Sequence, residues 1–197
     1  MSLQTVIFYG KSGSGKGTQA RLLKKFLEER DPEHRSLYIE TGAAFRTFAK
    51  KDNFTALLVK KTLDEGGLLP EFLPVWIWTQ FFIDNVEENE HIILDGLARR
   101  PDEVPILAKA LEFYNRAKPQ IVFLQITDDE AVARMRERGR SDDEETEIRK
   151  RLTWFNENVT PAVGKWRDFP EVEIHEINTA PPIEEVHTTI LKALKLS

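Results

Sequence analysis

A glycine-rich segment near the amino terminus has the residue types and spacing of a phosphate-binding loop. Residues 10–18 read GKSGSGKGT and match the pattern G-x-x-x-x-G-K. Glycines let the backbone fold around a phosphate so that successive amide hydrogens converge on it, and a following helix adds its positive end. Lys16 would supply the charge for the β- and γ-phosphates. The pattern predicts an ATP site formed by Gly13, Ser14, Gly15, Lys16, Gly17 and Thr18.

Position 17 is where this loop departs from the usual pattern. Glycine stands where a serine or threonine hydroxyl normally ligates magnesium, so Mg²⁺ must be held by the nucleotide, by water and by a carboxylate elsewhere. Asp95 follows an apolar run that resembles a strand, and an α/β sheet presents its site at the carboxyl ends of its strands. We therefore expect Asp95 to hold, through water, the Mg²⁺ that accompanies ATP.

A concentration of arginines between residues 134 and 151 is the second feature that could do chemistry. It comprises Arg134, Arg136, Arg138, Arg140, Arg149 and Arg151. One interpretation is a solvated helical face, compensated by acids such as Glu144 and Glu145. The other is a set of guanidinium groups that neutralise phosphates. Taken without further observations, the pattern favours the solvated face.

The elements that must position these groups alternate between strands and helices. Runs rich in β-branched and aromatic residues predict five strands, at residues 5–9, 36–39, 91–94, 121–126 and 172–177. Apolar residues at helical spacing predict helices within residues 104–114, 148–159 and 183–194. Such alternation implies crossover connections and a parallel sheet covered on both faces. We predict an α/β fold, a three-layer sandwich around a five-stranded parallel sheet.

Residues 41–89 contain helical patterns and no convincing strand, which predicts a helical subdomain that projects from the sheet. Its aromatic residues are expected to pack in a core rather than to stack on a base: Trp76, Trp78, Phe81 and Phe82.

Length and composition limit the remaining possibilities. The 197 residues, 41% of them hydrophobic, suit one domain that spans residues 1–197. No cysteine is present, so disulfides and thiolate metal sites are excluded. A formal net charge of −5 disfavours a nucleic-acid partner, and no stretch has the roughly 20 apolar residues of a membrane span. We expect a cytoplasmic monomer with no nucleic-acid or membrane partner.

Four segments in chain order resemble the adenylate kinases, a family of P-loop kinases. They are residues 15–19 (GKGTQ), residues 41–46 (TGAAFR), residues 95–99 (DGLAR) and residues 134–151 with the arginine cluster. Leu97-Ala98 stands where the family usually has Phe-Pro. The likeness spans nearly the whole chain, and it reverses the preference for a solvated arginine face.

The resemblance implies a nucleoside monophosphate kinase, which transfers a phosphoryl group reversibly from ATP to a nucleoside monophosphate. On the acceptor side it implies that Arg46 and Arg99 bind the monophosphate, with Thr41, Gly42 and Gly96 beside them. Residues 41–89 would then be the acceptor-binding subdomain. No general base is required, because a monophosphate is already mostly ionised near neutral pH.

On the donor side the resemblance implies a lid at residues 134–143, shorter than in ordinary members of the family. Arg134 would lie near the base and phosphates of ATP. Three further arginines would surround the transferring phosphoryl group and, with Lys16, form the catalytic set: Arg138, Arg140 and Arg151. The resemblance also implies that Asp95 faces the Mg²⁺.

Two residues predict different bases for the acceptor nucleotide. Thr41 favours AMP, because adenylate kinases carry threonine there, whereas Glu103 falls where the family has a glutamine that reads adenine. An ionised carboxylate only accepts hydrogen bonds and would face the N1 lone pair of adenine. If Glu103 contacts the base, it favours GMP; alternatively it is a first-turn helix residue facing solvent, and Thr41 selects adenine. We expect AMP.

Other functions stay open at this point. They are a kinase for GMP, CMP or UMP, a small-metabolite kinase that resembles gluconate or shikimate kinases, and a nucleotide-binding regulator without turnover. A hydroxyl acceptor needs a group that takes its proton, and the pair Arg46 and Arg99 argues for a phosphate acceptor instead. The presence of Lys16 and the lid arginines argues against a regulator.

Overall fold

The computed structural model describes residues 1–65, 69–139 and 144–197. Its centre is a five-stranded sheet in which every pair of neighbouring strands is parallel. The strands are β1 (Thr5–Gly10), β2 (Arg35–Glu40), β3 (Glu90–Asp95), β4 (Gln120–Gln125) and β5 (Glu173–Asn178), in the spatial order β2-β3-β1-β4-β5. All five predicted strands are confirmed, with ends that differ by at most one residue.

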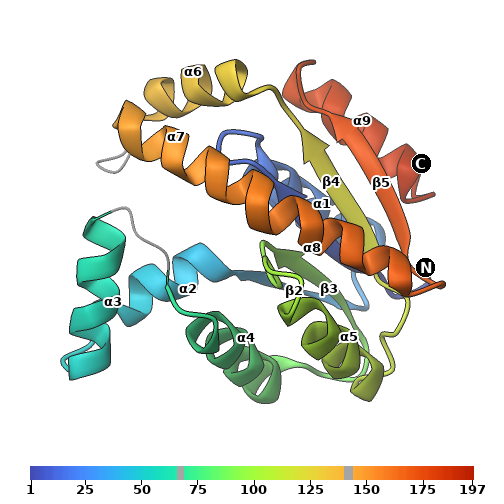
Figure 1. Ribbon diagram of the computed structural model, residues 1–197. Helices are drawn as coiled ribbons and strands as arrows, with labels where there is room; N and C mark the ends of the chain where they lie inside the picture. The colour runs from blue at the N-terminus through green and yellow to red at the C-terminus, as the bar shows by residue number, and fades with distance from the viewer. Residues whose placement is uncertain (66–68, 140–143) are drawn as a thin grey trace.

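Helices cover both faces of the sheet, as predicted (Figure 1). One face packs against α1 (Lys16–Arg30) and α9 (Ile183–Ala193). The other packs against α4 (Phe72–Asn85), α5 (Glu103–Phe113) and α8 (Thr160–Lys165). Val6 and Phe8 of β1 point to the first face, and Ile7 and Tyr9 point to the second. Because both sets are buried, the strand is apolar throughout rather than alternating.

The stretch from residue 41 to residue 89 is helical, and its described residues contain no strand. It forms α2 (Thr41–Phe48), α3 (Phe54–Asp64) and α4, and α3 begins where the Asn53 side chain accepts a hydrogen bond from the Ala56 N–H. A separate hydrophobic cluster holds these helices together: Phe45, Phe48, Ala56, Val59, Leu69 and Leu73. Trp78 and Phe82 are buried against the main sheet, whereas Trp76 is 41% exposed.

α6 (Asp128–Arg138) and α7 (Glu145–Trp154) pack against each other through a small hydrophobic cluster. α6 begins at a capping box formed by Thr127 and Glu130, and it ends at Gly139 in a left-handed conformation. An ion pair between Arg136 and Glu145 joins the end of α6 to the start of α7. The remainder of the predicted lid, residues 140–143, lies outside the described residues.

α7 continues through a π-helical turn, η1 (Phe155–Val159), into α8. The Thr160 N–H bonds to the Phe155 carbonyl, five residues earlier, which is the spacing of a π-helix. The next residue, Pro161, has no N–H to donate to the carbonyl of Glu157. This turn keeps Phe155 and Val159 on the buried side, so the predicted helical stripe is confirmed.

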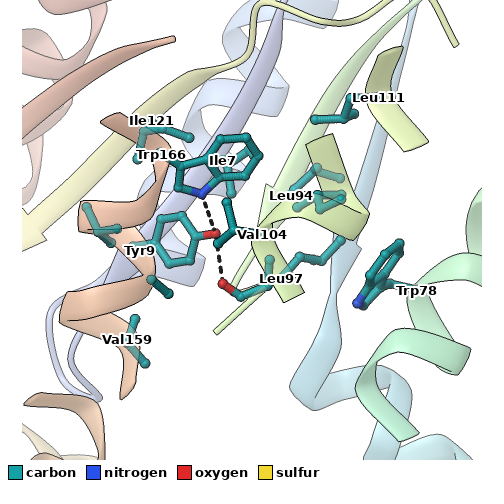
Figure 2. Close-up of a cluster of buried hydrophobic side chains, with 14 of the residues drawn as sticks. Ile7, Tyr9, Trp78, Leu94, Leu97, Val104, Leu111, Ile121, Val159 and Trp166 are labelled. Carbon is teal, nitrogen blue, oxygen red and sulfur yellow. Dashed lines mark hydrogen bonds between the residues drawn. The ribbon is translucent and has the colours of Figure 1, made fainter. Parts of the chain in front are cut away.

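A buried hydrogen-bonded chain links β1 to the segment that follows β3 (Figure 2). Trp166, in the 3₁₀ turn η2 (Trp166–Asp168), donates from Nε1 to the Tyr9 hydroxyl at 3.0 Å. Tyr9 in turn donates to the Ala98 carbonyl at 3.1 Å. Burial raises the pKa of Tyr9, so the phenol keeps the proton that it donates.

The hydrogen bond from Tyr9 uses a backbone conformation at Ala98 that proline, the usual residue of the family at this position, does not adopt. Ala98 has a φ of 48°, in the left-handed region. A proline ring fixes φ near −65°, so proline could not present its carbonyl to Tyr9 in this way. The Tyr9 hydroxyl therefore holds the segment that carries Asp95 and Arg99.

No helix in the described part of the chain has both the length and the apolar character that a bilayer crossing requires.

We expect Tyr9→Phe to lower the free energy of unfolding by roughly 1 to 3 kcal/mol for each of the two polar groups that it leaves buried without a partner. These groups are the Trp166 indole N–H and the Ala98 carbonyl. Urea denaturation followed by fluorescence would measure the change. Tyr114→Phe is the matched control, because the Tyr114 hydroxyl has no hydrogen bond with any described residue; equal effects of the two substitutions would contradict the prediction.

Candidate active site

The glycine loop connects the end of β1 at Gly10 to the start of α1 at Lys16. Gly13 and Gly15 both have a φ of 85°, which a side chain would make strained. The Ser14 N–H donates to the Lys11 carbonyl at 3.1 Å and closes the turn. The Lys16 ammonium lies inside the loop, where it donates to the carbonyls of Gly10 at 2.5 Å and Lys11 at 3.1 Å. The predicted ATP ligands are thus gathered around one turn at the amino end of a helix.

The loop is fixed against β4 and α6 by close backbone approaches. A Cβ atom at Gly13 would lie 2.9 Å from the Ala131 carbonyl oxygen on α6. The Lys11 ammonium reaches the Asp128 carboxylate at 2.5 Å and the Ile126 carbonyl at 3.4 Å. The lysine that follows the first glycine of the loop therefore anchors it to the start of α6.

Asp95 ends β3 next to the loop, as its predicted role requires. It is 4% exposed and accepts a hydrogen bond from the Tyr38 hydroxyl at 3.1 Å. A Cβ atom at Gly17 would lie 3.4 Å from Asp95 Oδ2 and 3.2 Å from Arg21 Nη1. Burial raises the pKa of Asp95, against the opposing effects of Lys16 and Arg99.

The donor set around Asp95 fits an ion that keeps most of its water. Among the described residues no three Asp, Glu, His or Cys side chains come together as a metal cage. Gly17 brings no hydroxyl, and the Asp95 carboxylate lies next to this position. Mg²⁺ commonly binds through one or two carboxylates, nucleotide phosphates and water, and this arrangement suits it.

A cavity of about 740 Å³ begins at Gly96, directly after Asp95, and lies between α2, α3, α4, α5 and α7. All six predicted acceptor residues line it: Thr41, Gly42, Arg46, Gly96, Arg99 and Glu103. Apolar and aromatic side chains form much of the remaining wall, among them Phe45, Leu97, Trp78 and Trp154. A volume and lining of this kind are typical of a small-molecule site.

Backbone carbonyls and an acid hold the cavity's guanidinium groups in place. Arg99 Nε donates to the Gly96 carbonyl at 2.8 Å, and the Thr41 hydroxyl donates to the same carbonyl at 3.1 Å. Gly96 has a φ of 70°, and a Cβ atom there would lie 2.3 Å from Arg99 Nη2. Arg46 Nη2 donates to Glu40 at 2.9 Å. Both arginines therefore occupy defined positions on the cavity wall.

Glu103 is the first residue of α5, as one interpretation expected, but it does not face solvent. It is 2% exposed, so that part of the interpretation is wrong. Its Oε2 accepts from the Arg99 backbone N–H at 2.8 Å, and its Oε1 accepts from Arg100 Nη1 at 3.3 Å. Burial raises the pKa of Glu103, while these donors lower it. The carboxylate turns back over the start of its own helix and onto the cavity.

Of the predicted lid arginines, the structure describes the side chains of Arg134 and Arg151, which bind different backbone carbonyls. Arg134 Nη2 donates to the Thr179 carbonyl at 2.7 Å, next to the start of α9. Arg151 on α7 donates from Nε to the Glu147 carbonyl at 3.3 Å. Arg138 is the last residue of α6, four positions after Arg134, and its side chain lies outside the description, as does all of Arg140. Their predicted convergence stays a prediction.

Sequence reasoning missed Arg100, Tyr38 and Trp154. Arg100 is only 15% exposed at its side chain, lines the cavity and lies over the Trp154 ring with its central carbon 5.4 Å from the ring centroid. The adjacent arginines at positions 99 and 100 were the available signal. Tyr38 and Trp154 had no motif, because only the fold brings them to Asp95 and Arg100.

The strand order, with a glycine loop between β1 and a helix that begins at a lysine, defines a P-loop protein of the α/β class. Comparison with known proteins narrows the class. The family model for adenylate kinase matches residues 8–170. The adenylate kinase of Leptospira biflexa is 30% identical over 198 residues, which are 98% of this chain and 100% of that protein.

Two further proteins that resemble the chain are also adenylate kinases. The adenylate kinase of Mycolicibacterium smegmatis is 31% identical over 96% of this chain and 98% of its own length. Adenylate kinase 1 of Nostoc sp. is 30% identical over 83% of this chain and 84% of its own length. The chain belongs to the adenylate kinase family. It is a phosphotransferase of the nucleoside monophosphate kinase type.

The two glycines with equal φ allow a test of the loop's packing against α6. We expect Gly15→Ala to lower the free energy of unfolding by about 1 to 2 kcal/mol, the strain of a left-handed alanine, because no atom of the described residues beyond its chain neighbours lies within 4 Å of the added carbon. Gly13→Ala should cost more and weaken ATP binding, because its Cβ also meets the Ala131 carbonyl. Calorimetric unfolding and ATP titration measure both; equal losses would show that α6 does not constrain the loop.

Proposed function

We propose that this enzyme transfers the γ-phosphoryl group of ATP to AMP and yields two molecules of ADP. The observation that carries the proposal is the cavity that begins directly after Asp95 and is lined by Thr41, Arg46 and Arg99. The relatives named adenylate kinase support AMP as the acceptor.

The glycine loop would bind the donor. Backbone N–H groups of the loop and the start of α1 would converge on the β- and γ-phosphates, and the Lys16 ammonium would exchange its carbonyl partners for phosphate oxygens. Thr18, in the first turn of α1, would add its hydroxyl group to the contacts with the same phosphates. Arg134 would lie beside the base and phosphates of ATP.

Arg46 and Arg99 would bind the acceptor phosphate. A planar guanidinium fork donates two hydrogen bonds to one phosphate, and two forks fix its orientation for in-line transfer. Glu40 and the Gly96 carbonyl position these forks before the acceptor arrives. The hydrogen bond from Thr41 to Gly96 keeps the glycine turn closed beneath them.

The transfer itself needs charge neutralisation more than covalent help. Lys16, Arg138, Arg140 and Arg151 would carry the charge that spreads over the moving phosphoryl group. Asp95 would hold Mg²⁺ through water beside the ATP phosphates, where the ion would supply further positive charge. The acceptor oxygen is already ionised near neutral pH, since the second pKa of a phosphate is about 6, so no side chain has to remove a proton.

The organisation we propose is one domain, residues 1–197, that acts as a cytoplasmic monomer. Residues 41–89 would bind the acceptor, and residues 134–143 would form a short lid over the donor.

Lys16→Met should nearly abolish phosphoryl transfer and leave the fold intact. The substitution removes the charge that meets the β- and γ-phosphates, while the methionine side chain fills similar space. A coupled assay of ADP formation measures turnover, and the unfolding midpoint controls for stability. Turnover within tenfold of the parent enzyme would contradict the role of the loop.

Arg99→Ala should impair use of the acceptor far more than use of ATP. Charge-assisted hydrogen bonds contribute on the order of 1.5 to 3 kcal/mol each, which predicts a fall in kcat/KM for AMP of roughly 10- to 100-fold. Arg167→Ala is the matched control, because Arg167 is exposed and pairs with Glu176 away from the cavity. An effect of Arg99→Ala on the KM for ATP alone would contradict the assignment.

A further inference from the structure

Two oppositely charged side chains, Arg100 and Glu103, stand side by side on the cavity wall that we assign to the acceptor. Charged side chains are rarely this well buried unless they are paired, and the Arg100 and Glu103 side chains are 15% and 3% exposed. In the proposed site, Arg46 and Arg99 already bind the phosphate of the acceptor. Arg100 and Glu103 can therefore bind a different polar group of the acceptor.

Both side chains keep hydrogen-bonding capacity beyond their contacts with the described residues. The Glu103 carboxylate has four lone-pair sites, and it accepts from the Arg99 N–H at Oε2, from Arg100 Nη1 at Oε1 and from the Arg100 backbone. Arg100 has five N–H donors. Its Nη2 donates to the Leu69 carbonyl at 3.2 Å, and its Nε lies 3.3 Å from Glu71. One acceptor on Glu103 and one donor on Arg100 can thus face the cavity together.

These contacts also fix the pair rigidly. Arg100 lies over the Trp154 ring, and the Arg99 N–H holds the Glu103 carboxylate at 2.8 Å. A guanidinium group held against an aromatic face keeps its donors in one plane. Aromatic and apolar side chains line the same cavity, which suits a flat heterocycle.

The polar edge of adenine requires one acceptor and one donor next to each other. Its exocyclic N6 amine donates a hydrogen bond, and its N1 accepts one. An ionised carboxylate can satisfy the amine but not N1, whereas a guanidinium group can satisfy N1 but not the amine. Neither Glu103 nor Arg100 alone can therefore read the base.

We propose that Glu103 and Arg100 act as one unit that recognises the acceptor base, in which Glu103 accepts from the N6 amine and Arg100 donates to N1. This inference rests on the proposed function, because it takes the cavity as the AMP site. It makes Arg100 a specificity-determining residue of the enzyme.

A double-mutant cycle tests the unit. Arg100→Met removes the donors and leaves N1 buried without a partner, so kcat/KM for AMP should fall roughly 10- to 100-fold. Glu103→Gln provides an amide with its own donor and acceptor. In that background Arg100→Met should lower kcat/KM less than about threefold, a coupling expected of two residues that act on the same base. Their ion pair also couples them, so the same cycle carried out on the unfolding midpoint measures that structural share. The affinity for ATP and the unfolding midpoint serve as controls.

Equal losses from Arg100→Met in the two backgrounds would overturn the proposal, because a purely structural role through Leu69, Glu71 and Trp154 is lost equally in both. A parent enzyme that uses GMP, CMP or UMP better than AMP would instead overturn the proposed acceptor, so the two failures are distinguishable.

Base analogues test the same contact without altering the protein, which covers the case in which a variant does not fold. The parent should use 1-deaza-AMP, which lacks N1, about tenfold less well than AMP. It should use 7-deaza-AMP, which keeps the N1 and N6 groups, nearly as well as AMP. Equal use of the two analogues would show that N1 has no donor and would overturn the role of Arg100.

Discussion

The parallel pairing of β1 with β3 brings the glycine loop and Asp95 to the same edge of the sheet, and the site depends on this pairing. Phe8 lies beside Asp95 in the register, so β1 reaches Gly10 two residues later, just beyond the end of β3. The space there is narrow. A side chain at Gly17 would contact Asp95, and a side chain at Gly96 would overlap Arg99. Glycine at these positions leaves room at one edge of the sheet for the charged groups of Asp95, Arg21 and Arg99.

The second constraint is the burial of carboxylates in a protein that must bind phosphates. Asp95 and Glu103 are each less than 5% exposed, and burial raises the pKa of both. Each is held by nearby donors: Tyr38 for Asp95, and the Arg99 N–H with Arg100 for Glu103. Partnered in this way, negative groups can stand close to phosphates without remaining uncompensated.

Much of this architecture could be predicted from the sequence because local patterns determine it. The strands are short apolar runs buried on both faces, so their positions follow from composition to within one residue. The loop follows from Gly15 and Lys16 alone. The environment of Glu103 could not be predicted in the same way, since an acid in the first turn of a helix is typically solvated. Only the fold shows that the chain before α5 turns the carboxylate toward Arg99 and Arg100.

Long-range contacts explain the remaining differences, and the contact between Arg100 and Trp154 has the widest effect. Trp154 is the last residue of α7, one turn after Arg151, so the guanidinium of Arg100 lies against the same helix that carries a predicted catalytic arginine. Arg100 also bonds to the Leu69 carbonyl at the entrance to α4. One side chain thus connects the acceptor cavity, the helical stretch of residues 41–89 and the helix after the lid. Each contact uses a different part of the same planar guanidinium group, so the three parts of the structure are held together at Arg100.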